Sequence, residues 1–159
     1  AETSGPGTTL VVRLPTTEVE SDAAATTRPP EAAVSRGAVL VVDDEEDVSD
    51  LIREILQREG FEVTVANSAE TALERVASGD FALILSDLNM PGLGGRGFYE
   101  RLLRDRPALA RRMGFVTGDT MSPQARGFLD GAGRPFLEKP IAPEELRRLA
   151  RAMLKGGAA

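Results

Sequence analysis

The stretch VLVVDDEEDV, residues 39–48, runs four aliphatic residues directly into five consecutive acidic residues. The aliphatic half has the length and composition of a fully buried β-strand. The acidic half admits two interpretations. It is either the solvated start of a helix, where carboxylates favour the positive end of the helix dipole, or part of a site that holds a cation. Residues elsewhere in the chain decide between these two interpretations.

Five short apolar segments of this kind occur after residue 37, and helical patterns lie between them. The predicted strands are 38–43, 61–66, 81–87, 113–117 and 136–137. Strands that alternate with helices in this way predict an α/β fold. The sheet is expected to be parallel and doubly wound, with helices on both faces.

Apolar spacing and helix-capping residues indicate where the helices lie. In the first helix, 47–59, one face is marked by Val48, Leu51, Ile52, Ile55 and Leu56. Ser68 is suited to cap the next helix, and Phe98 lies in a third. Ser122 is suited to begin a fourth, which Gly131 and Gly133 are expected to end. Pro143 opens the last helix.

The first 36 of the 159 residues contain no aromatic residue and differ from the rest of the chain. Residues 16–37 are rich in Thr, Ala, Pro and Glu, which predicts a flexible, disordered linker. Residues 1–15 are expected to be the remnant of a preceding domain, because GPGTTLVVRLP, residues 5–15, carries a strand pattern without a sheet to join. Residues 38–156 are expected to form the folded domain.

The composition excludes several classes of chemistry. The chain has no Cys and no His, which leaves no disulfides, no thiolate site and no histidine base or nucleophile. The net charge of −6 argues against binding to nucleic acid. No apolar run approaches the roughly 20 residues of a membrane span, so no membrane contact is expected. Catalysis would have to use carboxylates, hydroxyls, Lys, Arg or a bound metal.

Polar residues lie at the ends of four predicted strands. Asp43 and Asp44 end the first, Asp87 the third and Thr117 the fourth, and Lys139 follows the fifth. In a parallel sheet these ends meet at one edge, where ligands bind. Three carboxylates gathered there repel one another unless a cation neutralises them, and oxygen ligands without His suit Mg²⁺ best. A carboxylate at such a site can itself accept a phosphoryl group.

Each of these residues also has an ordinary interpretation, as a helix-start acid, a turn residue or a surface base. The lysine is the least ordinary, because 17 of the 19 basic residues are arginines. A compact ammonium beside a phosphoryl group is not replaceable by a guanidinium. Because such residues occur at all four of these strand ends, a common site is favoured over four unrelated ordinary roles.

Four short motifs, VVDDEE, SDLNMPG, TGD and FLEKP, stand in this order in the chain. With them the chain resembles the receiver domain of bacterial two-component response regulators over residues 37–156. The resemblance implies a CheY-like, flavodoxin-like fold with strand order 2-1-3-4-5. It also implies phosphoacceptor function in a phosphorelay, in which the domain catalyses its own phosphoryl transfer and dephosphorylation.

The same resemblance assigns roles to the residues of the motifs. Asp87 would accept the phosphoryl group, and Thr117 and Lys139 would contact it. Metal ligands, for Mg²⁺, would be Asp44, Asp87 and the main-chain carbonyl of Asn89, with Asp43 acting through a metal-bound water.

Three further features of the family are also expected. Phe136 would be the aromatic switch residue, and it lacks the hydroxyl of a tyrosine. Asn89 and Asp119 would tune the lifetime of the phosphoryl group. The Lys139–Pro140 peptide bond would be cis.

Residues 5–15 resemble the last Gly-rich turn and strand of the ATP-binding domain of sensor histidine kinases. This second resemblance implies a hybrid histidine kinase of which the chain holds the C-terminal receiver. The expected partners are the phosphohistidine domain of a kinase and a histidine phosphotransfer protein, and the expected location is the cytoplasm.

Two other functions could use an acidic site of this kind. A phosphohydrolase of the haloacid-dehalogenase type requires an acid two residues after its nucleophile, where this chain has Asn89. A degenerate receiver that only docks would not require the intact acids, Thr117 and Lys139. Within the opening stretch, Glu45, Glu46 and Asp47 are expected only to contact solvent and to suit the helix dipole.

Overall fold

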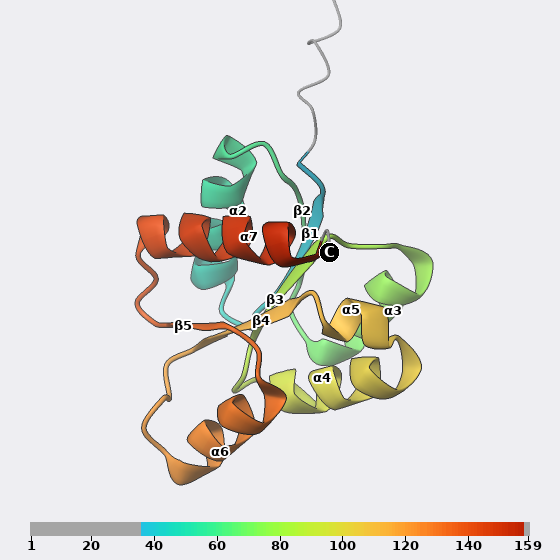
Figure 1. Cartoon of the computed structure of the whole chain (residues 1–159), viewed down its shortest axis with the longest axis vertical. Helices are drawn as coiled ribbons and strands as arrows, with labels where there is room; N and C mark the ends of the chain where they lie inside the picture. Colours follow the sequence, from blue (N-terminus) through green and yellow to red (C-terminus); the bar gives the residue numbers. More distant parts are fainter. Residues whose placement is uncertain (1–35, 158–159) are drawn as a thin grey trace, which may run out of the picture. The chain divides into compact units, whose positions relative to one another are not determined.

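A computed structural model describes residues 36–157 and shows a five-stranded sheet (Figure 1). Its strands are β1 (Ala38–Val42), β2 (Glu62–Ala66), β3 (Leu83–Asp87), β4 (Met113–Thr117) and β5 (Phe136–Glu138). All neighbouring strands are parallel and their order is β2-β1-β3-β4-β5, which confirms the expected topology. The expected strand at 5–15 lies outside the described residues, as does the expected linker except for its last two residues.

Helices cover both faces of this sheet. They are α2 (Glu46–Arg58), α3 (Ala69–Ser78), α4 (Gly94–Asp105), α5 (Pro107–Ala110), α6 (Pro123–Ala132) and α7 (Pro143–Gly157). Buried side chains of α2 and α7 form one apolar cluster with the sheet, and those of α3, α4, α5 and α6 form another. Figure 1 shows the two groups of helices on opposite sides of the strands.

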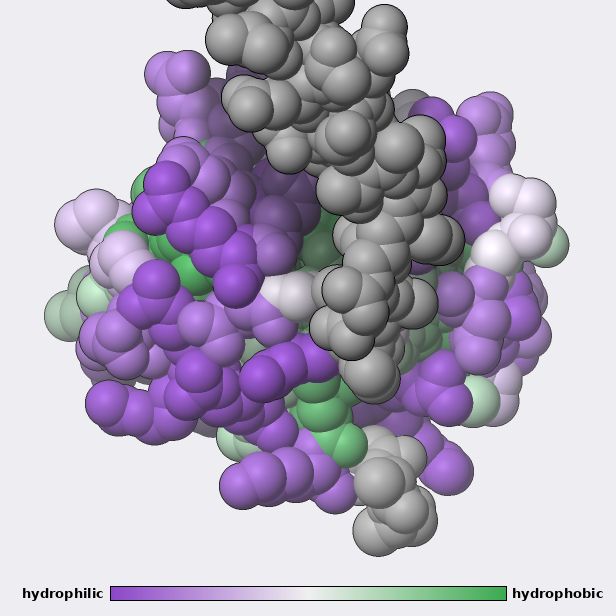
Figure 2. Space-filling model, turned by 90° about the horizontal axis from the view of Figure 1, so that it is seen from above, coloured by the Kyte–Doolittle hydropathy of each residue, from purple (hydrophilic) through white to green (hydrophobic). Residues whose placement is uncertain are grey.

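The two clusters explain the aliphatic run that opens the domain. Val39 and Val41 belong to the cluster of α2 and α7, whereas Leu40 and Val42 belong to the other cluster. Successive side chains of a strand point to opposite faces, and both faces of this strand are covered. All four side chains are therefore fully buried. On the face that Figure 2 shows, hydrophilic residues predominate outside the grey atoms.

Some local features differ from the sequence-based expectations. The helix α5 was not predicted, and its Leu109 and Ala110 are buried. The helix α6 continues through Gly131, and only Gly133, at φ 59°, ends it. Leu51, assigned to the inner face of the first helix, is 41% exposed.

Helix α4 begins in close contact with the end of β3. A Cβ atom added to Gly95 would lie 1.9 Å from the main-chain oxygen of Asp87. The Gly95 N–H also donates to the carbonyl of Leu88 at 3.2 Å. Only a residue without a side chain allows this approach, so Gly95 determines how closely α4 packs on the strand that carries Asp87.

We predict that Gly95→Ala lowers the free energy of unfolding by about 2–3 kcal/mol, because the methyl group overlaps main-chain atoms that cannot easily move. Urea denaturation measures this change. The matched control is Gly127→Ala in α6, where an added Cβ would meet no atom within 4 Å. That substitution should raise the free energy of unfolding by up to about 1 kcal/mol, because alanine is the better helix former. Equal effects from both substitutions would contradict the close packing of α4.

Candidate functional site

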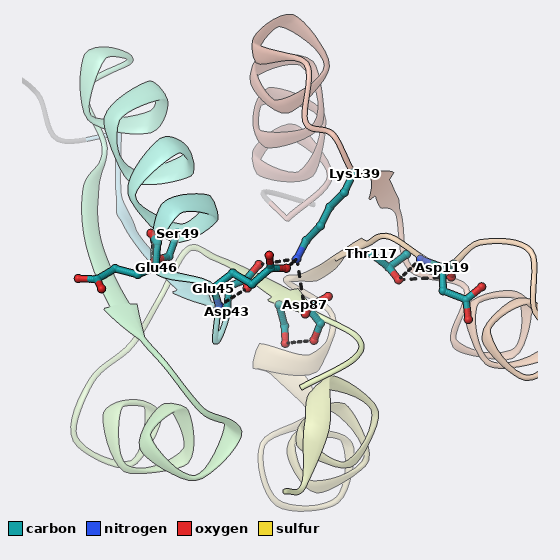
Figure 3. Close-up of polar contacts among 9 residues, drawn as sticks. Asp43, Glu45, Glu46, Ser49, Asp87, Thr117, Asp119 and Lys139 are labelled. Atoms are coloured by element: carbon teal, nitrogen blue, oxygen red, sulfur yellow. Dashed lines mark hydrogen bonds and ion pairs between the residues drawn. The ribbon is translucent and has the colours of Figure 1, made fainter. Parts of the chain in front are cut away.

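The structure brings the predicted strand-end residues together at the carboxyl edge of the sheet (Figure 3). Asp43 follows β1, Asp87 is the last residue of β3 and Thr117 the last of β4. Lys139 follows β5, and its N–H donates to the carbonyl of Thr117 at 2.9 Å. The Lys139–Pro140 peptide bond is cis, as expected.

Three carboxylates form a compact acidic cluster at this edge. Asp43, Asp44 and Asp87 offer oxygen atoms that all lie within 4.8 Å of one another. Asp43 is 2% and Asp87 4% exposed, whereas Asp44 is open to solvent. Burial raises the pKa of Asp87 to about 6, and nearby Asp43 adds to the rise while Lys139 opposes it. Burial likewise raises the pKa of Asp43.

The Lys139 ammonium is the cation that faces these carboxylates among the described residues. Its Nζ lies 3.1 Å from Oδ2 of Asp43 and 3.6 Å from Oδ2 of Asp87. The ammonium lies beside this buried Oδ2 of Asp43, but no hydrogen bond of good geometry reaches the atom. One ammonium therefore leaves the acidic cluster with excess negative charge.

Glu45 also belongs to this site, which corrects the expectation that it only contacts solvent. Its Oε1 accepts a hydrogen bond from Lys139 Nζ at 2.8 Å, the shortest of the lysine's ion-pair contacts. Glu46 and Asp47 are exposed acids in the first turn of α2, and their expected role toward solvent and the helix dipole stays a prediction. The pattern of acids in the sequence carries no signal that singles out Glu45.

The two predicted switch residues, Thr117 and Phe136, have different surroundings. Thr117 is fully buried, and its hydroxyl accepts a hydrogen bond from the N–H of Asp119 at 3.1 Å and lies 3.3 Å from the Asp119 carbonyl. Hydrogen bonds from the Ser122 side chain and from the N–H groups of Ser122 and Met121 lower the pKa of the Asp119 carboxyl. Phe136 is 45% exposed. The side chain of Asn89 is exposed in the loop after β3.

The acidic cluster fits a hard divalent cation. Its ligand atoms are carboxylate oxygens, the type that Mg²⁺ prefers. A buried carboxylate oxygen without a hydrogen bond, such as Oδ2 of Asp43, is uncommon in proteins and is explained if an ion satisfies it. Residues Asp43, Asp44 and Asp87 would then supply protein ligands, directly or through water.

A profile of the response regulator receiver domain matches residues 39–151. The chain belongs to the response regulator receiver family. Among curated relatives of this receiver domain, the uncharacterized transcriptional regulatory protein YkoG of Bacillus subtilis is 30% identical over 122 residues. Those residues make up 77% of this chain and 53% of YkoG. The sensory transduction protein RegX3 of Mycolicibacterium smegmatis is 32% identical over 121 residues, 76% of this chain and 52% of RegX3.

Solved receiver structures have the same fold. A CheY-like receiver domain protein from Methanospirillum hungatei has a TM-score of 0.70 and 29% identity, covering 76% of this chain and 95% of that protein. TrrA from Thermotoga maritima, solved in complex with Mg²⁺-BeF, has a TM-score of 0.66 and 28% identity, covering 74% of this chain and 98% of TrrA.

The relatives do not show which other domains accompany this receiver domain. The receiver domain spans about half the length of YkoG, a transcriptional regulatory protein by name, and of RegX3, a sensory transduction protein by name. The expected hybrid kinase therefore stays a prediction. Between residues 36 and 157, no helix has both the length and the apolar composition needed to cross a membrane.

We predict that Asp87→Asn stabilises the metal-free receiver, and increasingly so as pH rises. The folded domain binds the Asp87 proton more tightly than the unfolded chain, so the stability that this proton contributes is lost as pH rises through about 6. Asparagine stays neutral. The gain in the free energy of unfolding should be small at about pH 4 and about 3 kcal/mol near pH 8.

Urea denaturation in the presence of a chelator measures this difference. The control is Asp130→Asn, which removes an exposed carboxylate of α6 and should change stability by the same amount at both pH values. A gain in stability for Asp87→Asn that did not depend on pH would show that folding does not raise the pKa of Asp87.

Proposed function

We propose that this receiver domain takes a phosphoryl group from a phosphohistidine onto Asp87, with Mg²⁺, and switches conformation in response. The observation that supports the proposal best is the position of Asp87. Its buried carboxylate ends the central strand β3, lies in the cluster of three acids and faces the Lys139 ammonium at 3.6 Å. The relative TrrA was solved in complex with Mg²⁺-BeF, which supports Mg²⁺ as the metal of this proposal.

The transfer itself requires one nucleophile and one leaving group. An oxygen of ionised Asp87 attacks the phosphorus and forms the new P–O bond. The P–N bond to the donor imidazole breaks, and its electron pair stays on the nitrogen, which is neutral or takes up a proton from water. The chain contains no His, so the donor histidine lies outside these 159 residues.

Charge compensation is the main contribution of the surrounding residues. Asp43, Asp44, Asp87 and the carbonyl of Asn89 would hold Mg²⁺, which neutralises charge on the phosphoryl oxygens when it is bound. Lys139 already lies beside both buried acids, and its ammonium would bind a phosphoryl oxygen after a short movement.

The switch would start at Thr117. To reach a phosphoryl group on Asp87, its hydroxyl must leave the main chain of Asp119, to which it is now bound. The space that it vacates would allow Phe136, exposed in this conformation, to turn inward. Such a change is a two-state shift that a local charge event biases.

The partners and wider context form part of the same proposal. We expect a phosphohistidine domain of a histidine kinase as donor, with a histidine phosphotransfer protein as a further partner. We also expect the parent protein to be a hybrid histidine kinase and the domain to act in the cytoplasm. A phosphohydrolase activity is disfavoured, because Asn89 supplies an amide where the general acid would stand.

We predict that the receiver incorporates phosphate from acetyl phosphate in the presence of Mg²⁺, and that Asp87→Asn does not. Asparagine cannot form the acyl phosphate, so intact-mass spectrometry should show no added phosphate. Asp44→Asn should reduce the rate at least about tenfold, because it removes a proposed metal ligand. Glu46→Gln, which removes a nearby exposed charge outside the acidic cluster, is the control and should change the rate little.

Two results would overturn the assignment. Phosphate uptake by Asp87→Asn at the rate of the unchanged protein would place the nucleophile elsewhere. Steady turnover of a phosphate ester would instead favour the phosphohydrolase.

A further inference from the structure

We propose that Glu45 is a positioning residue that holds the Lys139 ammonium back from Asp87 in the unphosphorylated domain and must release it when a phosphoryl group arrives. The inference rests on the proposed function and assigns to this reaction a residue outside its metal and phosphoryl ligands.

The ion-pair distances of Lys139 are the first support. Its Nζ lies 2.8 Å from Oε1 of Glu45 but 3.6 Å from Oδ2 of Asp87. The attraction between charges is greater where water is excluded, so the buried Asp87 would be the stronger partner at equal distance. The ammonium nevertheless donates its hydrogen bond to Glu45, whose side chain is 61% exposed. The position of Lys139 therefore reflects a balance among three acids, in which Glu45 at 2.8 Å and Asp43 at 3.1 Å hold the ammonium closer than Asp87 does at 3.6 Å.

The conformation of Glu45 is the second support. It occupies the N-cap position of α2, yet its side chain makes no hydrogen bond to the first turn of that helix. Its N–H donates to Oδ1 of Asp43 at 2.9 Å, and its carbonyl accepts from the N–H of Ser49 at 3.1 Å. These two bonds fix the main chain of Glu45 on both sides. Its carboxylate is thus free to extend toward Lys139 (Figure 3).

The contact has a direct consequence for the phosphorylated state. A phosphoryl group on Asp87 brings additional negative charge and strong acceptor oxygens to the side of Lys139 that faces Asp87. Lys139 then has to exchange Glu45 for a phosphoryl oxygen, and the lost ion pair reduces the net stability of the phosphorylated form. Glu45 therefore opposes activation, although it lies beside the acids that promote it.

The test measures binding of beryllofluoride, a phosphoryl analogue, at saturating Mg²⁺. We expect Glu45→Gln to bind it about 2- to 5-fold more tightly than the unchanged protein, the range for one partly exposed ion pair. Glu46→Gln is the matched control: it removes the same charge one residue away, without a contact to Lys139. Glu45→Asp keeps the charge but is too short for the 2.8 Å contact, so it should resemble Glu45→Gln.

A spectroscopic readout follows the lysine itself. The NMR signal of the Lys139 ammonium should shift between the unchanged protein and Glu45→Gln in the free state, and coincide in the beryllofluoride complexes. Equal beryllofluoride affinities for Glu45→Gln and Glu46→Gln, with the unchanged protein binding normally, would overturn the role of Glu45. If the unchanged protein itself failed to bind beryllofluoride with Mg²⁺, the proposed function would fall instead.

Discussion

The burial of two like-charged carboxylates beside a third is the interaction on which the rest of this site depends. Asp43 and Asp87 are almost entirely withdrawn from water, and a single ammonium faces them. Removing ionised groups from water is costly unless opposite charge compensates them. The excess negative charge that remains accounts for the affinity expected toward a divalent cation. The raised pKa of Asp87 comes mainly from its burial, and the charge of Asp43 adds to the rise. The rest of the fold, a sheet covered by helices on both faces, supplies the stability that offsets this unfavourable arrangement.

The sheet can hold it because its central strands are buried on both faces. Every residue of β3 is buried, from Leu83 to Asp87, and helix α4 packs directly against the carbonyl of Asp87 through Gly95. Apolar burial on both sides supplies the stabilisation that offsets the charged strand end. The carboxylate is thereby presented at a fixed point, and the loops that carry Lys139 and Glu45 close around it.

Much of the site could be predicted from the sequence, because strand ends in a parallel sheet meet at one edge. That rule brought Asp43, Asp87 and Lys139 together without any knowledge of side-chain positions. It could not identify Glu45, whose contact joins residues 94 positions apart and depends on which of several adjacent acids the lysine reaches. Helix α5 was missed because four residues carry too little periodicity to separate a helix from a loop.

The hydrogen bond between Glu45 and Lys139 also affects the attachment of helix α2 to the molecule. Just before its first residue, α2 is joined through Glu45 to the connection that leads into α7, and just after its last residue it is joined to α7 through Glu59, which binds Arg147 and Arg151. The first of these contacts uses the Lys139 ammonium, which would bind the phosphoryl group after phosphorylation. The second contact does not involve Lys139. Loss of the first would loosen only the start of α2, because its buried side chains and Glu59 keep the rest of the helix in place. Its opening turn is therefore the part of the helix that would report the state of the site.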